Sequence, residues 1–251
     1  MAIKVYYHIH CTGDTYADLF LVDEQLKALQ WSRLLYSAEV NCVITGENSW
    51  GLHDLVIRTL GRERKRCVNI LERTDTDEEQ LYEGRTLQYL WRDAQPDDAI
   101  CYMHTKGISY LTGQRKVNGV FNARHIKAIN GWRIKMEEKI LTEWPQRIAA
   151  MTHSDTQGCY FKQDPFWHYM GNFWWAKGSH ILKLPNPITH DPLPYPGSHF
   201  EETKPARMKY EQWLFRKEGY HLNLEPYMDW PKRQLGYADG FNPYEDDVSE
   251  P

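Results

Sequence analysis

Strand-like and helix-like segments alternate along residues 1–140, and this alternation constrains the fold more than any other feature of the sequence. Apolar runs rich in β-branched and aromatic residues predict strands at Ile3–His10, Glu39–Ile44, Arg66–Leu71 and Ala99–Met103. Apolar residues at three- and four-residue spacing predict helices that include Leu19–Tyr36, Leu87–Ala94 and Ile129–Ile140. Strands alternating with helices form a mostly parallel sheet with helices on both faces, so we expect an α/β fold.

The second half of the chain has a less regular pattern. Strands are predicted at Gly158–Phe161, Gly171–Ala176 and Tyr220–Leu224, and a helix at Pro205–Glu218. The Pro-rich stretch 185–205 predicts a long surface loop, and such loops are uncommon unless they are functional. No repeat or long linker divides the 251 residues. We therefore expect a single domain with two subregions, 1–130 and 131–230, followed by a tail at 231–251.

Composition excludes several classes of protein. The formal net charge of −4 gives no reason to expect nucleic acid as a partner. No segment approaches the roughly 20 apolar residues that a membrane-spanning helix needs, so no transmembrane segment is expected. The 5 cysteines form no CxxC pair and the N-terminus lacks a secretory pattern, which predicts reduced thiols and a cytoplasmic protein.

Polar residues follow directly after the predicted buried strand Ala99–Met103. His104 and Lys106 share the same side-chain parity if the strand continues through Thr105, so both could face one ligand. A lysine ammonium is a compact positive charge that suits phosphate oxygens. In parallel sheets, ligands bind beyond the carboxyl ends of the strands, where this segment lies. The alternative is a solvated turn.

An aromatic segment in the second half is the next candidate. Asn172 follows a glycine and precedes three aromatic residues, which include Trp174 and Trp175. A polar side chain beside aromatic rings could hold a sugar. The alternative is an ordinary core strand.

Glu211 is a candidate general base. On a helix, Glu211 would have Met208, Leu214 and Phe215 as its neighbours at three- and four-residue spacing. A carboxylate among apolar neighbours needs a partner or a raised pKa, and a raised pKa suits a general base. A structural glutamate that caps a neighbouring loop is an equally good interpretation.

Asp75 and Asp77 form an Asp-x-Asp pair after the third predicted strand. Carboxylates in this arrangement could bind Mg²⁺ or Mn²⁺ against a diphosphate. The same residues, followed by glutamates, also fit the N-terminal cap of a helix, which is the stronger interpretation.

Four motifs in order resemble a family of bacterial and viral glycosyltransferases. They are YMHTKGIS, GWRIKMEEKIL, GNFWWAKGSHILKLP and YEQWLF. The His-Thr-Lys segment followed by a Trp-Arg helix is also similar to the rhamnan-synthesis protein F family of polysaccharide glycosyltransferases, and EGRTLQYL resembles the helix that this family places before the strand. The resemblance covers roughly residues 83–215 by motif.

This resemblance implies the GT-A architecture, in which one continuous sheet carries a nucleotide-binding half and an acceptor-binding half. Residues 1–130 would then bind the nucleotide sugar, and residues 131–230 the acceptor. Many GT-A enzymes bind a divalent metal with Asp-x-Asp at the end of the fourth core strand. His104-Thr105-Lys106 stands in that position here, so Lys106 could neutralise the diphosphate, while Asp75 or Asp77 could bind ribose, base or a displaced metal.

The implied reaction transfers a sugar, with rhamnose as one candidate, from a UDP- or dTDP-sugar to a hydroxyl of a glycan acceptor. The resemblance places Glu211 as the base of an inverting reaction. His8, His10 and Thr12 would contact the nucleotide, and the aromatic segment would position donor sugar or acceptor.

Two other functions fit the sequence. A noncatalytic carbohydrate-binding protein of the same fold would account for an aromatic content of 14% and the missing Asp-x-Asp. A metal-dependent phosphohydrolase would use Asp75 and Asp77 directly.

Overall fold

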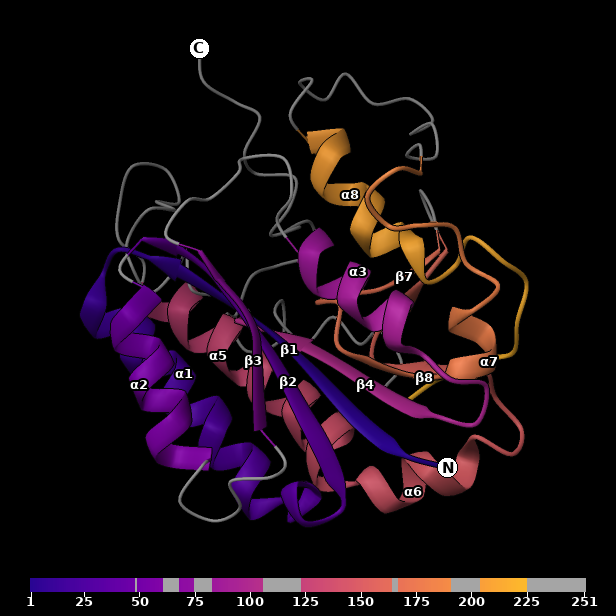
Figure 1. The fold of residues 1–251 in the computed structure, drawn as a ribbon, viewed down its shortest axis with the longest axis horizontal. Helices are drawn as coiled ribbons and strands as arrows, with labels where there is room; N and C mark the ends of the chain where they lie inside the picture. Colours follow the sequence, from indigo (N-terminus) through magenta and orange to yellow (C-terminus); the bar gives the residue numbers. More distant parts are fainter. Residues whose placement is uncertain are drawn as a thin grey trace.

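A seven-stranded sheet runs through the computed structural model (Figure 1), which describes residues 1–47, 49–60, 68–74, 83–105, 123–163, 167–190 and 204–224. The strand order is β3-β2-β1-β4-β8-β5-β9. The strands are β1 (Ile3–Thr12), β2 (Ala38–Glu47), β3 (Val68–Thr74), β4 (Ala99–His104), β5 (Thr156–Gly158), β8 (Trp174–Lys177) and β9 (His221–Asn223). The first four are parallel to one another, and β8 runs antiparallel between β4 and β5. The predicted α/β class with a mostly parallel sheet is confirmed.

Helices cover both faces of this sheet (Figure 1). One face packs against α1 (Thr15–Trp31), α2 (Ser49–Leu60), α5 (Ala123–Glu137) and the π-helical turn Glu138–Thr142 that continues α5. The other face packs against α3 (Gly84–Asp93), α7 (Gly178–Ile181) and α8 (Lys204–Trp213). The remaining elements are the short helices Leu34–Tyr36 and α6 (Trp144–Ala150) and the hairpin of β6 (Phe161–Lys162) and β7 (His168–Tyr169).

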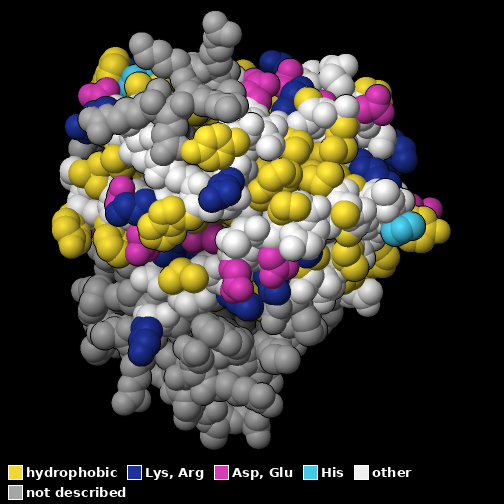
Figure 2. All heavy atoms as spheres, turned by 90° about the horizontal axis from the view of Figure 1, so that it is seen from below, with side chains coloured by type: hydrophobic (Ala, Val, Ile, Leu, Met, Phe, Trp, Pro, Cys, Tyr) yellow, Lys and Arg dark blue, Asp and Glu magenta, His cyan; other side chains and the backbone are white. Residues whose placement is uncertain are grey.

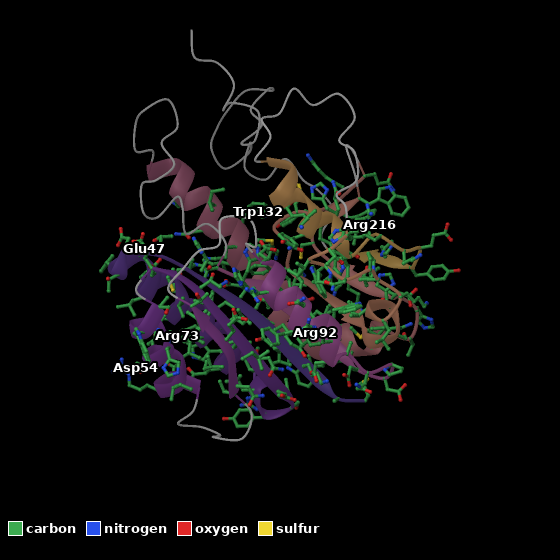
Figure 3. All side chains as sticks on the ribbon, turned by 45° about the horizontal axis from the view of Figure 1, so that its top comes forward. Glu47, Asp54, Arg73, Arg92, Trp132 and Arg216 are labelled. Carbon is green, nitrogen blue, oxygen red and sulfur yellow. The ribbon has the colours of Figure 1, made fainter. Side chains whose placement is uncertain are left out.

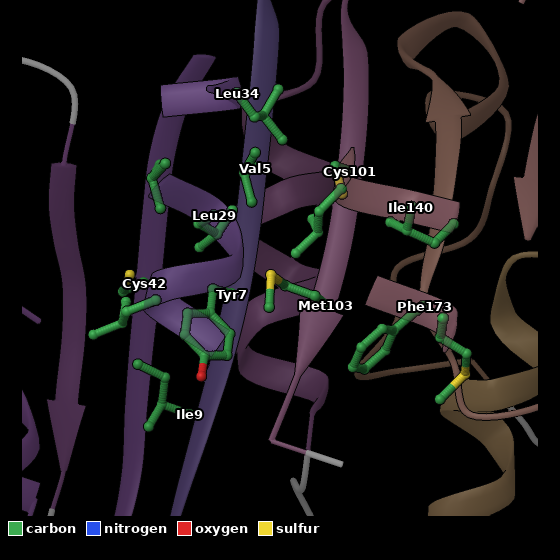
Figure 4. Packing of buried hydrophobic residues seen from close by; sticks show 14 of the residues in the cluster. Val5, Tyr7, Ile9, Leu29, Leu34, Cys42, Cys101, Met103, Ile140 and Phe173 are labelled. Carbon is green, nitrogen blue, oxygen red and sulfur yellow. The ribbon is translucent and has the colours of Figure 1, made fainter. Parts of the chain in front are cut away.

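Alternate residues of β1 enter different cores. Val5, Tyr7 and Ile9 point into the cluster under α1, α2 and α5, where Figure 4 shows them among aliphatic side chains and cysteines. Tyr6 points the other way, into the cluster under α3 and α8. Burying one large apolar side chain contributes about 1.5–3 kcal/mol, so both clusters stabilise the sheet.

Several predicted boundaries were wrong for local reasons. The helix that includes Leu19 begins at Thr15, where the Asp14 carboxylate caps α1 by accepting a hydrogen bond from the backbone N–H of Ala17. The predicted strand Gly158–Phe161 is broken at Tyr160, which has a φ of 56°. The helix predicted to reach Tyr36 ends at Trp31, so Tyr36 lies on a separate exposed turn.

Two further boundaries differ near the aromatic segment. The strand predicted from Gly171 begins only at Trp174, because Gly171 and Asn172 have φ values of 86° and 53° and form a turn. The last helix ends at Trp213 rather than Glu218. Of the Pro-rich loop predicted at 185–205, only 185–190 and 204–205 belong to the described residues.

Charges of both signs are mixed on the surface shown in Figure 2, where Lys and Arg lie among Asp, Glu and exposed apolar side chains. None of the helices in the described part of the chain combines the length and hydrophobicity that crossing a bilayer requires. Four of the cysteines are buried and take part in no disulfide, namely Cys11, Cys42, Cys101 and Cys159.

Candidate functional site

Two buried histidines lie side by side on β1 and β4, and the one on β4 is at the carboxyl end of its strand. His8 and His104 are register partners across the two parallel strands, and they are 3% and 6% exposed. His8 Nδ1 is 2.9 Å from the hydroxyl of Thr86 on α3. Burial lowers the pKa of His8 to about 3, against a smaller opposing effect of the Glu83 charge. His8 is therefore neutral at physiological pH.

Thr105 fastens the end of β4 to β1. Its backbone N–H donates to the carbonyl of His8 at 3.1 Å, and its hydroxyl accepts from the backbone N–H of His10 at 2.9 Å. Thr12 ends β1, and its N–H and hydroxyl both donate to the carboxylate of Asp18. These hydrogen bonds hold the backbone in place at the carboxyl edge of the sheet, where the predicted donor-binding residues lie.

A carboxylate that the sequence did not single out lies at the centre of this edge. Glu83, only 7% exposed, is the residue before α3. Its Oε2 accepts hydrogen bonds from the hydroxyl of Tyr102, at 3.0 Å, and from the side-chain amide of Asn172. Its Oε1 lies 3.5 Å from His104 Nδ1. No local signal in the sequence separates Glu83 from an ordinary glutamate at a helix start, because tertiary packing brings Tyr102 and Asn172 to it.

Asn172 joins this carboxylate to the aromatic segment. It adopts a left-handed conformation, with its amide on Glu83 and its Oδ1 accepting from the indole of Trp174 at 2.9 Å. The preceding carbonyl of Gly171 lies 2.8 Å from His104 Nε2. Non-glycine residues at positive φ cost energy and often occur at functional sites, where surrounding contacts hold them.

Trp174 and Trp175 are buried on opposite faces of the sheet. Trp174 is 1% exposed and stacks on Tyr102 with ring centroids 5.1 Å apart. Trp175 is 0% exposed and donates its indole N–H to the carbonyl of Ile140 at 2.8 Å. Both rings therefore belong to the core of the structure.

Glu211 lies on α8 near the same edge and is half-buried. Burial raises the pKa of Tyr102 well above its ordinary value, followed by the charges of Glu83 and then Glu211, so both carboxylates lie within electrostatic reach of this hydroxyl. Gly84 permits the close approach of α8 to the start of α3, because a Cβ there would lie 2.5 Å from the Tyr210 hydroxyl.

A polar row crosses the ends of the three neighbouring strands on the same face. His10, Thr45 and Thr74 are register partners on β1, β2 and β3. The hydroxyl of Thr45, a residue 5% exposed, is buried without a hydrogen-bond partner. Glu47, which ends β2, marks this edge in Figure 3.

The remaining predicted residues, Lys106, Asp75 and Asp77, lie outside the described part of the chain. Within the described ranges, no group of three or more His, Cys, Asp or Glu side chains is arranged to hold a metal ion. The structure thus brings together His8, His10, His104, Thr105 and Asn172, with Thr12 and Glu211 at the same edge.

Comparisons with known proteins give a family and one distant likeness. The model of a family described as a domain of unknown function (DUF8361) matches residues 6–218, and this is not the rhamnan-synthesis protein F family that the motifs resemble. No curated protein matches the chain. A solved structure from Desulfovibrio desulfuricans G20, assigned as a nucleotide-diphospho-sugar transferase, is similar at 11% identity and a TM-score of 0.42, over 90% of this chain and 81% of that chain. A likeness at this level does not establish an activity.

Proposed function

This chain belongs to the DUF8361 family, a domain of unknown function, and we propose that it is a glycosyltransferase that uses a nucleotide-diphosphate sugar. Its donor would be a UDP- or dTDP-sugar, rhamnose among the candidate sugars, and its acceptor a glycan hydroxyl. The proposal rests on the residues at the carboxyl edge of the sheet.

One observation carries the proposal: several buried polar side chains are grouped around the carboxyl end of β4. His8, His104, Glu83 and Asn172 are each less than 9% exposed. Burying polar groups costs free energy that a hydrophobic core could avoid, so their concentration favours a binding site. Parallel sheets bind ligands at this edge. Thr45 adds a buried hydroxyl that still lacks a hydrogen-bond partner.

The proposed donor site has two parts. The row His10, Thr45 and Thr74 would face the nucleoside, since hydroxyl and imidazole groups bond readily to ribose and base. Lys106, two residues beyond His104 in the sequence, would face the diphosphate and stabilise the charge that develops on it. Asp75 and Asp77 would hold Mg²⁺ or Mn²⁺ if the reaction uses one.

Glu211 would act as the base of an inverting transfer. The acceptor hydroxyl would give its proton to the Glu211 carboxylate while its oxygen forms the bond to the anomeric carbon. The bond from that carbon to the phosphate oxygen breaks, and its electron pair leaves with the nucleoside diphosphate. Glu83 suits this role less well, because its oxygens already face three donor groups.

Donor turnover with a matched pair of variants tests the proposal. Wild-type protein is incubated with UDP- and dTDP-sugars and a glycan mixture, with and without EDTA, and release of UDP or dTDP is measured. We expect Glu211→Gln to lower kcat by about 10²–10⁴-fold with donor affinity retained. Glu218→Gln, at an exposed glutamate after α8, serves as the control.

Other outcomes would identify a different function. Sugar binding without any turnover would indicate the noncatalytic carbohydrate-binding protein. Release of inorganic phosphate that depends on Asp75 and Asp77 would indicate the phosphohydrolase. Wild-type turnover in Glu211→Gln would remove Glu211 as the base.

A further inference from the structure

The proton positions on His104 follow from its two neighbours. Its Nε2 lies 2.8 Å from the carbonyl oxygen of Gly171, and a carbonyl only accepts hydrogen bonds, so Nε2 carries a proton. Its Nδ1 faces the Oε1 of Glu83 at 3.5 Å, an ion-pair distance. A neutral His104 would therefore turn a nitrogen lone pair toward a carboxylate oxygen, which is repulsive.

A second proton removes this repulsion, and it belongs on the histidine. In free side chains imidazole binds a proton more tightly than a glutamate carboxylate by about two pKa units. The Oε2 of Glu83 accepts hydrogen bonds from both Tyr102 and Asn172, so the carboxylate acts as an acceptor toward these neighbours. His104 thus carries protons on both ring nitrogens and forms an ion pair with Glu83.

We propose that a doubly protonated His104 cancels the charge of the buried Glu83 carboxylate at the end of β4, and that this cancellation favours the binding of a nucleotide diphosphate there. This inference rests on the proposed function. Without the proton on His104, the buried Glu83 carboxylate would repel the anionic donor at the edge where it must lie. Glu83 is therefore a positioning residue in this proposal and does not touch the substrate.

Among the described groups around the pair, only Glu211 brings a further charge. From β1, His8 is neutral because burial lowers its pKa to about 3. From β4, Tyr102 stays a neutral donor because burial and Glu83 raise its pKa. From α8, Glu211 adds negative charge, which makes the proton on His104 more favourable. Asn172, from the turn before β8, is uncharged.

Nitrogen-15 NMR of the histidine rings tests the protonation directly and requires no substrate. At pH 7 we expect both His104 nitrogens to be protonated in the wild-type protein, and only Nε2 in Glu83→Gln. An unprotonated Nδ1 in the wild-type protein would overturn the inference.

Nucleotide affinity tests the consequence, with UDP, dTDP and GDP titrated calorimetrically in EDTA. His104→Gln keeps a donor for the Gly171 carbonyl but removes the positive charge, and we expect about tenfold weaker binding of whichever nucleotide binds the wild-type protein. Glu83→Gln removes the carboxylate, and His104 then loses its second proton, so both charges disappear together. The nucleotide affinity of this variant should therefore stay within about threefold of the wild-type value. The double variant, with both His104→Gln and Glu83→Gln, should recover most of the nucleotide affinity that His104→Gln alone loses.

His180→Gln is the matched control, because the buried His180 also has its Nε2 on a backbone carbonyl, that of Leu214 at 2.9 Å. We expect unchanged nucleotide affinity in that variant. A double variant as weak as His104→Gln would overturn the inference. If no nucleotide binds the wild-type protein, the proposed function fails, and the NMR result still decides the protonation of His104.

Discussion

The two faces of the sheet use the same strands for different purposes. On the face covered by α1, α2 and α5, β1 contributes Val5, Tyr7 and Ile9 to a largely aliphatic core (Figure 4). On the face covered by α3 and α8, alternate residues of the same strand are Tyr6 and His8. Both faces therefore contribute to stability, while the second also carries the His8 side chain that contacts Thr86 on α3.

This difference shows how a parallel sheet can carry a site without losing its core. Strands buried on both faces usually read as continuous apolar runs. Here the alternation of polar and apolar residues in β1 resembles that of a half-exposed strand, although nearly all of them are buried. Substitutions of buried residues on either face should thus change stability, and substitutions of the polar residues on the face under α3 and α8 should also change ligand binding and pH response.

The largest effect is expected from Trp175→Ala on the aliphatic face. Trp175 is 0% exposed and its indole donates to the carbonyl of Ile140, so truncation leaves a cavity and an unpaired acceptor. We expect a loss of about 4 kcal/mol in the free energy of unfolding, measured by urea denaturation. Trp167→Ala, at a ring that is 48% exposed, should cost under about 1 kcal/mol. A loss as small as this at Trp175 would contradict the assignment of that face as the core.

On the polar face, His8 should make stability depend on pH. Its pKa in the folded protein is about 3, below the ordinary 6.5, so the unfolded chain binds more protons between these values. The stabilisation is complete above about pH 6.5 and declines as pH falls toward 3, by up to about 1.4 kcal/mol per pH unit. Urea denaturation from pH 7 to pH 4.5 measures this slope.

His8→Asn should flatten the slope because the variant has no imidazole to protonate. The matched control is His153→Asn, since His153 is exposed and should leave the slope unchanged. An equal slope in His8→Asn and wild-type protein would show that other groups cause the pH dependence.

The sequence predicted the first four strands because their apolar runs are bounded by turn residues and separated by helical spacing. It also singled out His8, His10, His104 and Asn172, although His8 and His10 lie within β1, which continues to Thr12, and Asn172 lies in a turn rather than in the predicted strand. What it could not reveal was Glu83 as the hub of the site. A glutamate before a helix resembles an ordinary surface residue until tertiary packing brings Tyr102 and Asn172 onto its oxygens.

The aromatic segment illustrates a second limit of the sequence. Trp174 and Trp175 have the composition of a stacking wall, but neighbouring residues of a strand point to opposite faces. The turn at Gly171 and Asn172 sets where β8 begins, and its positive φ values depend on contacts with residues far away in sequence. Local spacing therefore could not show that both rings are buried.

Asn172 gives the next largest effect because it joins backbone conformation to the polar network. Asn172→Ala removes the hydrogen bonds to Glu83 and Trp174. It also places an alanine at a φ of 53°, a conformation that asparagine tolerates better than alanine does. We expect a loss of about 2–3 kcal/mol in thermal or urea unfolding. Asn172→Gly should recover about 1 kcal/mol of this, because glycine adopts the conformation freely. Equal losses in the two variants would mean that the backbone conformation contributes nothing.

Two adjacent tyrosines compare the faces most directly and give the smallest effects. The hydroxyl of Tyr7 donates to Gln25 at 2.7 Å, where both residues are 0% exposed, so Tyr7→Phe leaves the Gln25 oxygen without that donor and without water. The hydroxyl of Tyr6 donates to Asp93 at 2.6 Å, but the Asp93 side chain is 55% exposed and water can replace the lost donor. We expect urea denaturation to show a loss of about 1–2 kcal/mol for Tyr7→Phe and under about 1 kcal/mol for Tyr6→Phe. A larger loss for Tyr6→Phe than for Tyr7→Phe would mean that burial of the acceptor does not decide the free-energy cost of losing the donor. The two faces would then differ only in their charged groups.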